Sequence, residues 1–320
     1  MSKGFVWFCQ NSNDTDYSRL SCELARTIKK HNKENNVCVI VDKESVFQSE
    51  HVDIIKVLSN DDAHGHQKKF ANEYKVFDLT PFTHTIKLEA DMLWNSCTDW
   101  WWYYLWQHDL VFSVDCFDYK EQQVKDKEYR PYHQRNFLPN VYNGMTYFRR
   151  SMFAKDFFDT CEAIVKNWKF VKENLLINCF DELPTTDVVY ALAYRLIDPT
   201  SQQLLDYPWF KFIHNKPAIH RKKYMADPQN YYYPMRIDDS VFFGEKKITA
   251  PLHYFYKNFL EVEVSIQEKV EIIQNGENNY ILEGMTPVKV EPRIDMNVFP
   301  EIENFTSDPY WPTESFIWKK

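Results

Sequence analysis

Residues 85–94, TIKLEADMLW, organise the fold that the sequence predicts. Read as a β-strand, the stretch places its side chains alternately on an apolar face and a polar face. Glu89 and Asp91 then share the polar face about 7 Å apart, two strand steps of about 3.3 Å each. Two carboxylates at this spacing can reach one divalent cation, and their hard oxygens suit Mg²⁺ or Mn²⁺. A solvated strand face is the alternative, but acids that close an apolar strand favour a site.

The composition indicates a folded chain with reduced thiols. Of its 320 residues, 44% are hydrophobic and 17% aromatic, which is ample for a core. Seven cysteines without a CxxC pair favour a cytoplasmic location (that of the host, if a phage encodes the chain) over a zinc cluster or disulfide framework. No run approaches the roughly 18 apolar residues of a membrane span, so no membrane partner is expected. The net charge of -8 gives no overall attraction to nucleic acid.

The first hundred residues alternate strand and helix. Apolar runs that predict strands lie at 5–9, 37–41, 54–58 and 85–94, with helices expected at about 16–31 and 68–79. This alternation predicts an α/β fold with a mostly parallel central sheet. Ligands bind at the carboxyl ends of such strands, where Asn11, Glu89 and Asp91 lie. With only six glycines and no GxGxxG or Walker sequence, any phosphate must be held by a metal and cationic side chains.

The residues before the paired acids resemble the segment that leads into the metal motif of GT-A glycosyltransferases. They read Lys75-x-x-x-Leu79-Thr80-Pro81-Phe82-x-x-Thr85-Ile86-x-Leu88-Glu89-Ala90-Asp91. The segment is most similar to the glycogenin-like glycosyltransferase family 8 and its phage and bacterial relatives. The resemblance implies a Rossmann-like GT-A sheet, a cation held by Asp91 and Glu89, and Lys75 on the donor diphosphate or sugar. The chain departs from the family by having Glu89 where an aspartate is usual.

Later residues match the same family in order. Asn143 and Gly144 resemble a strand whose backbone approaches the donor sugar, although Asn-Gly alone indicates a turn or bulge. The resemblance implies that Asp187 faces the acceptor or donor sugar as a general base or charge stabiliser, although its place at a helix start could explain it. It also implies a metal ligand at His253 and a diphosphate contact at Lys257, but the family's intervening glycine is missing. A structural histidine is an equal alternative.

Four further segments have either two interpretations or none. Segments 118–139 and 217–236 mix cationic and aromatic residues, as in solvated loops that pack a few rings or in an acceptor surface for phosphates and bases. The aromatic run at 98–106 predicts a helix buried on two sides, with a stacking surface as the alternative. Beyond about residue 262 the pattern predicts a small β appendage and tail, whose role the residues do not reveal.

The sequence therefore predicts a GT-A-like domain over 1–261, with a nucleotide-sugar half (1–115), an acceptor half (116–261) and an appendage over 262–320. The expected activity is metal-dependent sugar transfer, with Mn²⁺ or Mg²⁺ as cofactor and a UDP-sugar as donor. The expected acceptor is a hydroxymethylated pyrimidine in phage duplex DNA, and the alternative is a glycan or protein hydroxyl. A nucleotidyltransferase usually has a Gly-rich loop after its first strand, which is missing here. A non-catalytic nucleic-acid-binding module would leave the two acids unused.

Overall fold

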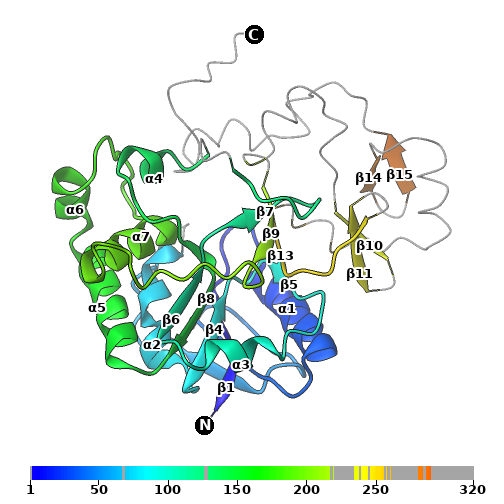
Figure 1. Cartoon of the computed structure of the whole chain (residues 1–320). Coiled ribbons are helices and arrows are strands. Elements are labelled where there is room, and N and C mark those ends of the chain that lie inside the picture. The colour runs from blue at the N-terminus through cyan, green and yellow to red at the C-terminus, as the bar shows by residue number, and fades with distance from the viewer. Residues whose placement is uncertain are drawn as a thin grey trace.

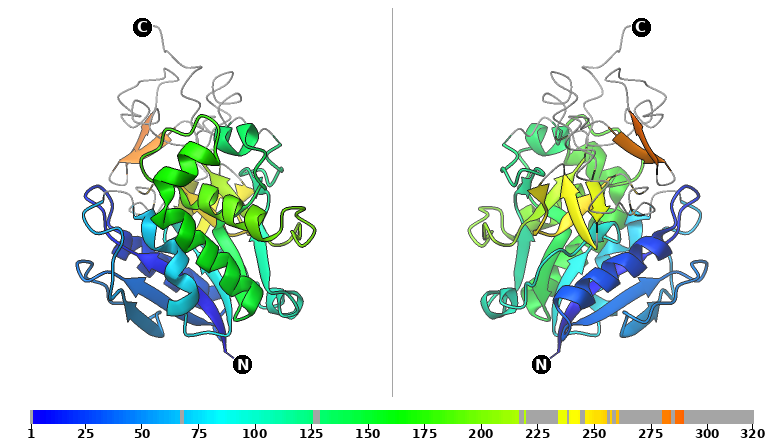
Figure 2. Two further views of the ribbon diagram at one scale, coloured as in Figure 1. Left: turned by 90° about the vertical axis from the view of Figure 1, so that its left-hand side faces the viewer. Right: turned by 90° about the vertical axis from the view of Figure 1, so that its right-hand side faces the viewer.

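The computed structural model describes residues 2–66, 69–125, 129–216, 219, 234–237, 239–243, 246–255, 257, 260, 280–283 and 286–289. In this part of the chain, a central sheet lies between two groups of helices, as Figures 1 and 2 show. No helix among these residues is both long and apolar enough to cross a bilayer.

The central sheet has six strands in the order β3-β2-β1-β4-β8-β6. Their bounds are β3 (Ile54–Val57), β2 (Asn36–Val41), β1 (Lys3–Cys9), β4 (His84–Leu88), β8 (Tyr142–Arg149) and β6 (Leu110–Ser113). The first four pair in parallel, and β8 runs antiparallel to both of its neighbours. A mixed, mostly parallel sheet flanked by helices confirms the predicted α/β class and is compatible with a Rossmann-like architecture.

Each face of this sheet buries its own hydrophobic core, because side chains alternate along the strands. In β1, Phe5 and Trp7 face the core that α1 (Tyr17–His31) and α3 (Trp101–Leu105) cover, whereas Val6 faces the other core. The second core is covered by η1 (Phe70–Lys75, a 3-10 helix), α2 (Val76–Leu79), α4 (Pro131–Arg135), α5 (Met152–Lys166), α6 (Trp168–Asn174) and α7 (Thr186–Ile197). In Figure 2, the green helices α5 and α7 face the viewer on the left, and the blue helix α1 does so on the right.

Smaller sheets join distant parts of the chain. One has the order β5 (Met92–Leu93), β13 (Leu252–Tyr254), β9 (Phe212–Asn215) and β7 (Cys116–Phe117). A second contains β10 (Pro234–Ile237), β11 (Ser240–Phe243) and β12 (Lys246–Lys247), and a hairpin is formed by β14 (Tyr280–Glu283) and β15 (Thr286–Lys289). The predicted halves 1–115 and 116–261 both supply strands to the first of these sheets. Apart from the hairpin, the predicted appendage at 262–320 lies outside the described residues.

The strand predicted at 85–94 is shorter than expected. It ends at Leu88, and residues 89–91 form a turn before β5. Thr85 and Lys87, predicted on the polar face of the strand, are fully buried, because both faces of β4 are covered. The prediction that strand alternation brings the two acids together is therefore wrong, since a turn carries them. The strand predicted as buried at 54–58 is an edge strand with mostly exposed side chains.

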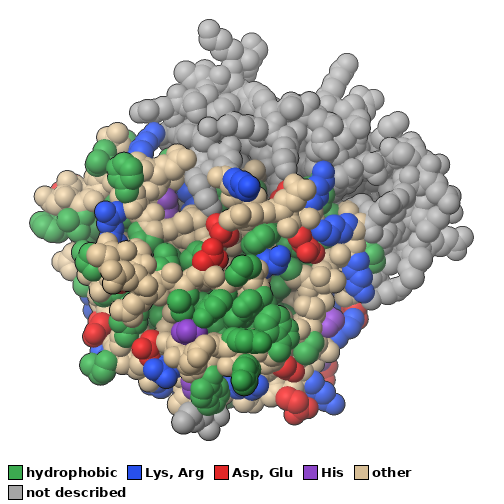
Figure 3. All heavy atoms as spheres, viewed as in Figure 1, with side chains coloured by type: hydrophobic (Ala, Val, Ile, Leu, Met, Phe, Trp, Pro, Cys, Tyr) green, Lys and Arg blue, Asp and Glu red, His purple; other side chains and the backbone are tan. Residues whose placement is uncertain are grey.

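Helix α3 is buried on one side only, and the predicted burial on two sides is wrong. Trp101 lies in the core, whereas Trp100, Tyr103 and Tyr104 are 48%, 81% and 47% exposed. Trp209 extends this aromatic surface, with its ring centroid 5.1 Å from that of Trp100. In Figure 3, hydrophobic side chains gather over the position that α3 occupies in Figure 1.

Candidate metal and nucleotide site

Glu89, Asp91 and His253 converge beside the carboxyl end of β4, and we refer to them as the acid–histidine cluster. Their ligand atoms all lie within 4.8 Å of one another. His253 Nε2 lies 3.2 Å from both Glu89 Oε2 and Asp91 Oδ1. The three residues predicted as metal ligands thus lie together, although 162 positions separate Asp91 from His253 in the sequence (253 minus 91).

Backbone pairing fixes the turn that carries the two acids. Strand β5 directly follows this turn and pairs with β13, which places His253 opposite Met92. The Tyr254 amide also donates to the Asp91 carbonyl oxygen at 3.1 Å. The side chain of Asp91 is 15% exposed and that of Glu89 is 23% exposed. The acids are therefore held in an ordered, partly buried turn that solvent can reach.

Two cations compensate the charge of these acids. Lys257 forms an ion pair with Asp91 Oδ2, and its Nζ also donates to the Tyr254 carbonyl oxygen at 3.1 Å. Burial disfavours the ionised form of Asp91, but Lys257 and His253 outweigh burial and hold the pKa of Asp91 well below its usual value. Burial also opposes the charging of His253, yet Asp91 and Glu89 raise the pKa of His253 above its ordinary value. Asp91 is therefore ionised throughout the neutral pH range.

This set of donor atoms fits a hard divalent cation. Carboxylate oxygens are the ligands that Mg²⁺ and Mn²⁺ prefer, and an imidazole nitrogen suits a transition metal. His253 turns Nε2 toward the acids, and its buried Nδ1 has no hydrogen-bond partner among the described residues. The His253 ring stacks on His214 with 4.6 Å between the ring centroids, which limits its rotation. Of the two ions, Mn²⁺ matches the mixed oxygen and nitrogen donors better.

Asn143 and Gly144, the predicted contacts of a donor sugar, lie on β8 against Glu89. Asn143 Nδ2 donates to Glu89 Oε1 at 2.8 Å. A Cβ atom at Gly144 would lie 3.3 Å from Glu89 Oε2 and 3.3 Å from the Phe212 ring. The pairing of β8 with β6 shifts register at this point, as a bulge requires. The Asn-Gly pair therefore shapes the space around the Glu89 carboxylate.

Asp187 lies in the first turn of helix α7 and turns its carboxylate toward β8. Its Oδ1 accepts the main-chain N–H of Asn143 at 2.7 Å, and its Oδ2 lies 3.5 Å from Arg130 Nη2. Thr185 stands at the N-cap of α7 and makes no side-chain capping hydrogen bond. The described contacts connect Asp187 to the acid–histidine cluster through Asn143.

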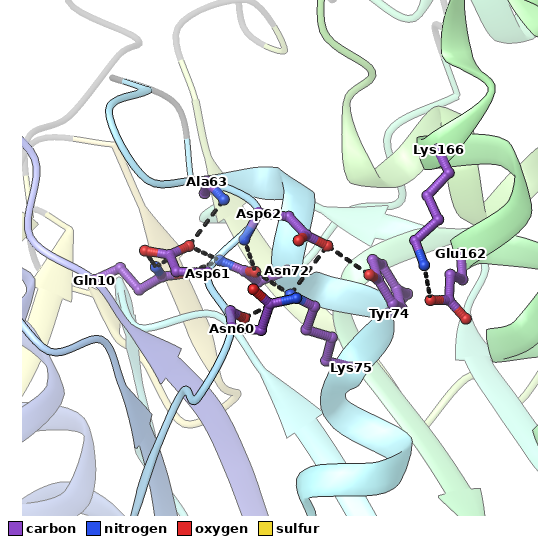
Figure 4. Close-up of polar contacts among 10 residues, drawn as sticks. All are labelled: Gln10, Asn60, Asp61, Asp62, Ala63, Asn72, Tyr74, Lys75, Glu162 and Lys166. Atoms are coloured by element: carbon purple, nitrogen blue, oxygen red, sulfur yellow. Dashed lines mark hydrogen bonds and ion pairs between the residues drawn. The ribbon is translucent and has the colours of Figure 1, made fainter.

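Lys75 and Asn11, the other predicted donor contacts, lie in polar networks at the carboxyl ends of β3 and β1. Lys75 Nζ pairs with Asp62 at 3.0 Å and donates to the Asn60 carbonyl oxygen at 2.7 Å (Figure 4). Asn11 Oδ1 accepts the Ser18 amide at 3.0 Å and so holds the start of α1. Because β1 is the parallel neighbour of β4, the end of β1 lies at the same edge of the sheet as the acid–histidine cluster.

The sequence analysis missed a second acidic group, which Figure 4 shows beside Lys75. Asp61 accepts hydrogen bonds from Asn72 Nδ2 at 2.6 Å and from the Ala63 amide at 2.8 Å, and Gln10 Nε2 lies 3.3 Å from its Oδ2. Burial alone would raise the pKa of Asp61, but the hydrogen bonds from Asn72 and Ala63 lower it below the usual value. The available signal was the SNDD run that closes the strand at 54–58.

The basic and aromatic segment 118–139 is only partly internal where the structure describes it, since Lys120, Lys125 and Phe137 are exposed. Tyr119 and Tyr129 are each 5% exposed, and Arg130 is 1% exposed. These three side chains therefore do not form the exposed surface for phosphates and bases that was one interpretation of this segment. Most of 217–236 lies outside the described residues.

Comparisons with protein-family models and with curated proteins find no match for the chain. The class of protein is therefore described from the fold and the candidate site alone. The class is an α/β protein with a partly buried acid–histidine cluster at the carboxyl edge of a mostly parallel sheet.

Proposed function

We propose that the protein is a metal-dependent glycosyltransferase with a nucleoside-diphosphate sugar, a UDP-sugar in our hypothesis, as donor. The observation that carries this proposal is the convergence of Glu89, Asp91 and His253 within 4.8 Å. Its position supports the proposal, because ligands of α/β sheets bind at the carboxyl ends of the strands. The resemblance of residues 75–91 to the GT-A motif, and to the glycogenin-like family in particular, supports the same chemistry.

In this proposal, Glu89, Asp91 and His253 hold Mn²⁺ or Mg²⁺. A bound divalent cation neutralises the negative charge that develops on the departing nucleoside diphosphate. Lys257 adds to this stabilisation, since its ammonium group lies against Asp91 and binds phosphate as a compact point charge. With Asp91 engaged in holding a metal, Lys257 would be the cation available to a phosphate oxygen of the donor.

The network at the ends of β1 and β3 is the proposed nucleoside contact. Asp61, which is partly exposed, presents a carboxylate at the same edge of the sheet as the acid–histidine cluster, and the buried Gln10 amide lies against it. A carboxylate in this position can accept hydrogen bonds from ribose hydroxyls. Lys75 is engaged by Asp62 and the Asn60 carbonyl oxygen, so we assign it to ordering this network rather than to the diphosphate.

Asp187 has a supporting role in this scheme. Its carboxylate is 9% exposed and engaged by the Asn143 amide and Arg130, so it is poorly placed to reach an acceptor hydroxyl. We therefore assign Asp187 to holding Asn143, which in turn contacts Glu89. This assignment replaces the general-base role expected from the sequence resemblance.

For the acceptor, we propose a glycan or protein hydroxyl ahead of modified DNA. An extruded base needs rings and cations at the surface. In 118–139 the side chains of Tyr119, Tyr129 and Arg130 are buried, which removes part of the support for DNA. The two acceptor classes are separated by comparing sugar transfer to a duplex with hydroxymethylcytosine, to the plain duplex and to an oligosaccharide.

Nucleotide binding with and without Mn²⁺ tests the proposed function. UDP at 100 times its dissociation constant should stabilise the protein by about 2.7 kcal/mol in the presence of Mn²⁺. Removing the metal should abolish most of this effect. Asp91→Ala should remain folded and lose both the Mn²⁺-dependent stabilisation and the release of UDP from a UDP-sugar.

A matched control and two outcomes complete this test. Asp109→Asn removes the charge of another partly exposed acid, which directly precedes β6 and pairs with Arg149 at 2.6 Å. This variant should leave both readouts unchanged. Full UDP release by Asp91→Ala in the presence of a metal chelator would contradict the proposal. Release of pyrophosphate with transfer of a nucleotidyl group would indicate the nucleotidyltransferase alternative instead.

A further inference from the structure

Lys87 is a buried cation on β4, two residues before Glu89. Its side chain is 0% exposed, and its Nζ lies 2.5 Å from Glu73 Oε2 on helix η1. Desolvating two charges costs several kcal/mol per ion, so a buried ion pair is weak evidence for stability by itself. The other contacts of Lys87 therefore indicate the role of this ion pair.

The further contact of Lys87 is with Asn143. Lys87 Nζ donates to the Asn143 carbonyl oxygen at 3.2 Å. The same residue donates its main-chain N–H to Asp187 Oδ1 at 2.7 Å and its side-chain Nδ2 to Glu89 Oε1 at 2.8 Å. Asn143 lies where β8 shifts register against β6, so these contacts hold it at an interruption of the strand pairing. Three hydrogen bonds thus fix both the position and the orientation of Asn143.

The acids of the acid–histidine cluster also affect the pKa of Glu73. Burial raises the pKa of Glu73 above its usual value, Lys87 opposes this rise, and the negative charges of Glu89 and Asp91 add to it. Lys87 is therefore the cation that holds down the pKa of Glu73 against burial and against the two acids of the cluster.

We propose that Lys87 and Glu73 are positioning residues for the cation site. Glu73 orients Lys87, Lys87 fixes Asn143, and Asn143 holds the Glu89 carboxylate in the orientation that a cation requires. This inference rests on the proposed function, because it assigns a role toward the cation that Glu89 would bind. Groups that hydrogen-bond to metal ligands typically contribute about 10–100-fold to metal affinity.

The test makes two measurements on the full chain. Calorimetry measures Mn²⁺ affinity, and thermal unfolding in the absence of Mn²⁺ measures stability. Lys87→Met leaves Glu73 buried without its partner and should lose stability as well as Mn²⁺ affinity. The double variant Lys87→Met/Glu73→Gln removes both charges and should recover much of the lost stability. The Asn143 carbonyl oxygen still lacks its donor in the double variant, so Mn²⁺ affinity should stay about tenfold or more below wild type.

A control variant separates positioning from folding. Tyr147→Phe removes a buried 2.7 Å hydrogen bond to His84 at the opposite end of the same two strands. It should lower stability and leave Mn²⁺ affinity unchanged. Mn²⁺ affinity that returns together with stability in the double variant overturns the inference, because the pair would then act only on folding. A wild-type chain that binds no Mn²⁺ overturns the proposed function and the inference together.

Discussion

A histidine lies at each end of β4, and the two histidines have opposite electrostatic surroundings. At its amino end, His84 Nδ1 shares a 2.7 Å hydrogen bond with the Tyr147 hydroxyl, and the His84 ring stacks on Trp106 with 3.8 Å between centroids. Burial and the positive charge of Arg149 lower the pKa of His84. At the carboxyl end, His253 faces two carboxylates at 3.2 Å each, and these raise its pKa despite burial.

The difference shows that burial of a histidine does not by itself indicate a site. A neutral imidazole bonded to a phenol uses its polar atoms within the protein and leaves little capacity for a ligand. Each ionised carboxylate has two oxygens and about four acceptor positions, and side chains alone rarely use them all. The partners of a buried histidine, and the charge that they carry, therefore distinguish a structural contact from a candidate metal ligand.

The largest expected effect comes from making the same substitution at both histidines. His253→Gln replaces a cation ligand with a weaker donor and should lower Mn²⁺ affinity by at least about tenfold. His84→Gln should lose the hydrogen bond and the ring stacking, about 1–2 kcal/mol of stability, with Mn²⁺ affinity unchanged. Calorimetric titration with Mn²⁺ and urea unfolding measure the two effects. Equal Mn²⁺ affinities for the two variants would remove the distinction between the two ends.

A smaller effect is expected from methyl groups added at two glycines. At Gly144, a Cβ atom would lie 3.3 Å from Glu89 Oε2, so the carboxylate must shift by a few tenths of an ångström. Gly144→Ala should therefore weaken Mn²⁺ binding a few-fold with little loss of stability. At Gly4, on β1, a Cβ atom would lie 2.6 Å from the Asn36 backbone oxygen, and Gly4→Ala should cost about 1–3 kcal/mol of stability.

The two glycine variants are compared by the same pair of measurements, Mn²⁺ titration and urea unfolding. Gly4→Ala is the control, because it perturbs packing at the amino ends of the strands, where no cation is proposed. A larger loss of Mn²⁺ affinity in Gly4→Ala than in Gly144→Ala would show that the affinity follows global stability and not the space around Glu89.

Much of the fold was predictable because local signals and packing agree there. The apolar runs in β1 and β2 are buried strands, and α1 lies where a helix was expected, with Asp16 capping it by accepting the Ser18 and Arg19 amides. The turn after Leu88 was not predictable, since TIKLEADML keeps the alternation of a strand across it. The partner of β5 is β13, which lies far away in the sequence, so no local pattern reveals where β4 ends.

The candidate site was predictable in part for the same reason. The order of motifs placed Asp91, Glu89 and His253 in one group, and the structure brings these residues together. Lys87 was placed on the polar face of the predicted strand, and nothing in that pattern indicated that it is buried. Its burial depends on Glu73, and the pairing of these two side chains across separate elements leaves no periodic signal in the sequence.

The smallest expected effect concerns Asp239, an acid that cations also compensate but at the protein surface. Burial opposes the ionised form, yet Arg236, Arg26 and Lys30 together outweigh it and lower the pKa of Asp239 to about 2. Because this value lies below that of an unfolded aspartate, about 3.9, the ion pairs stabilise the fold above about pH 4. This contribution is lost as the pH falls toward 2. In the acid–histidine cluster, by contrast, the compensated acids are mostly buried.

Asp239→Asn isolates this surface charge, because asparagine also tolerates the left-handed backbone at this position, where φ is 63°. Exposed ion pairs contribute about 1 kcal/mol or less, so the variant should be less stable than wild type by that amount at pH 6. The difference should shrink as the pH falls toward 2, where about half of the folded protein has Asp239 protonated, and urea unfolding across this range measures it. A difference that stays at its pH 6 size at pH 2 would assign the effect to packing, and any loss of Mn²⁺ affinity at pH 7 would show that the surface pairs and the cluster are coupled.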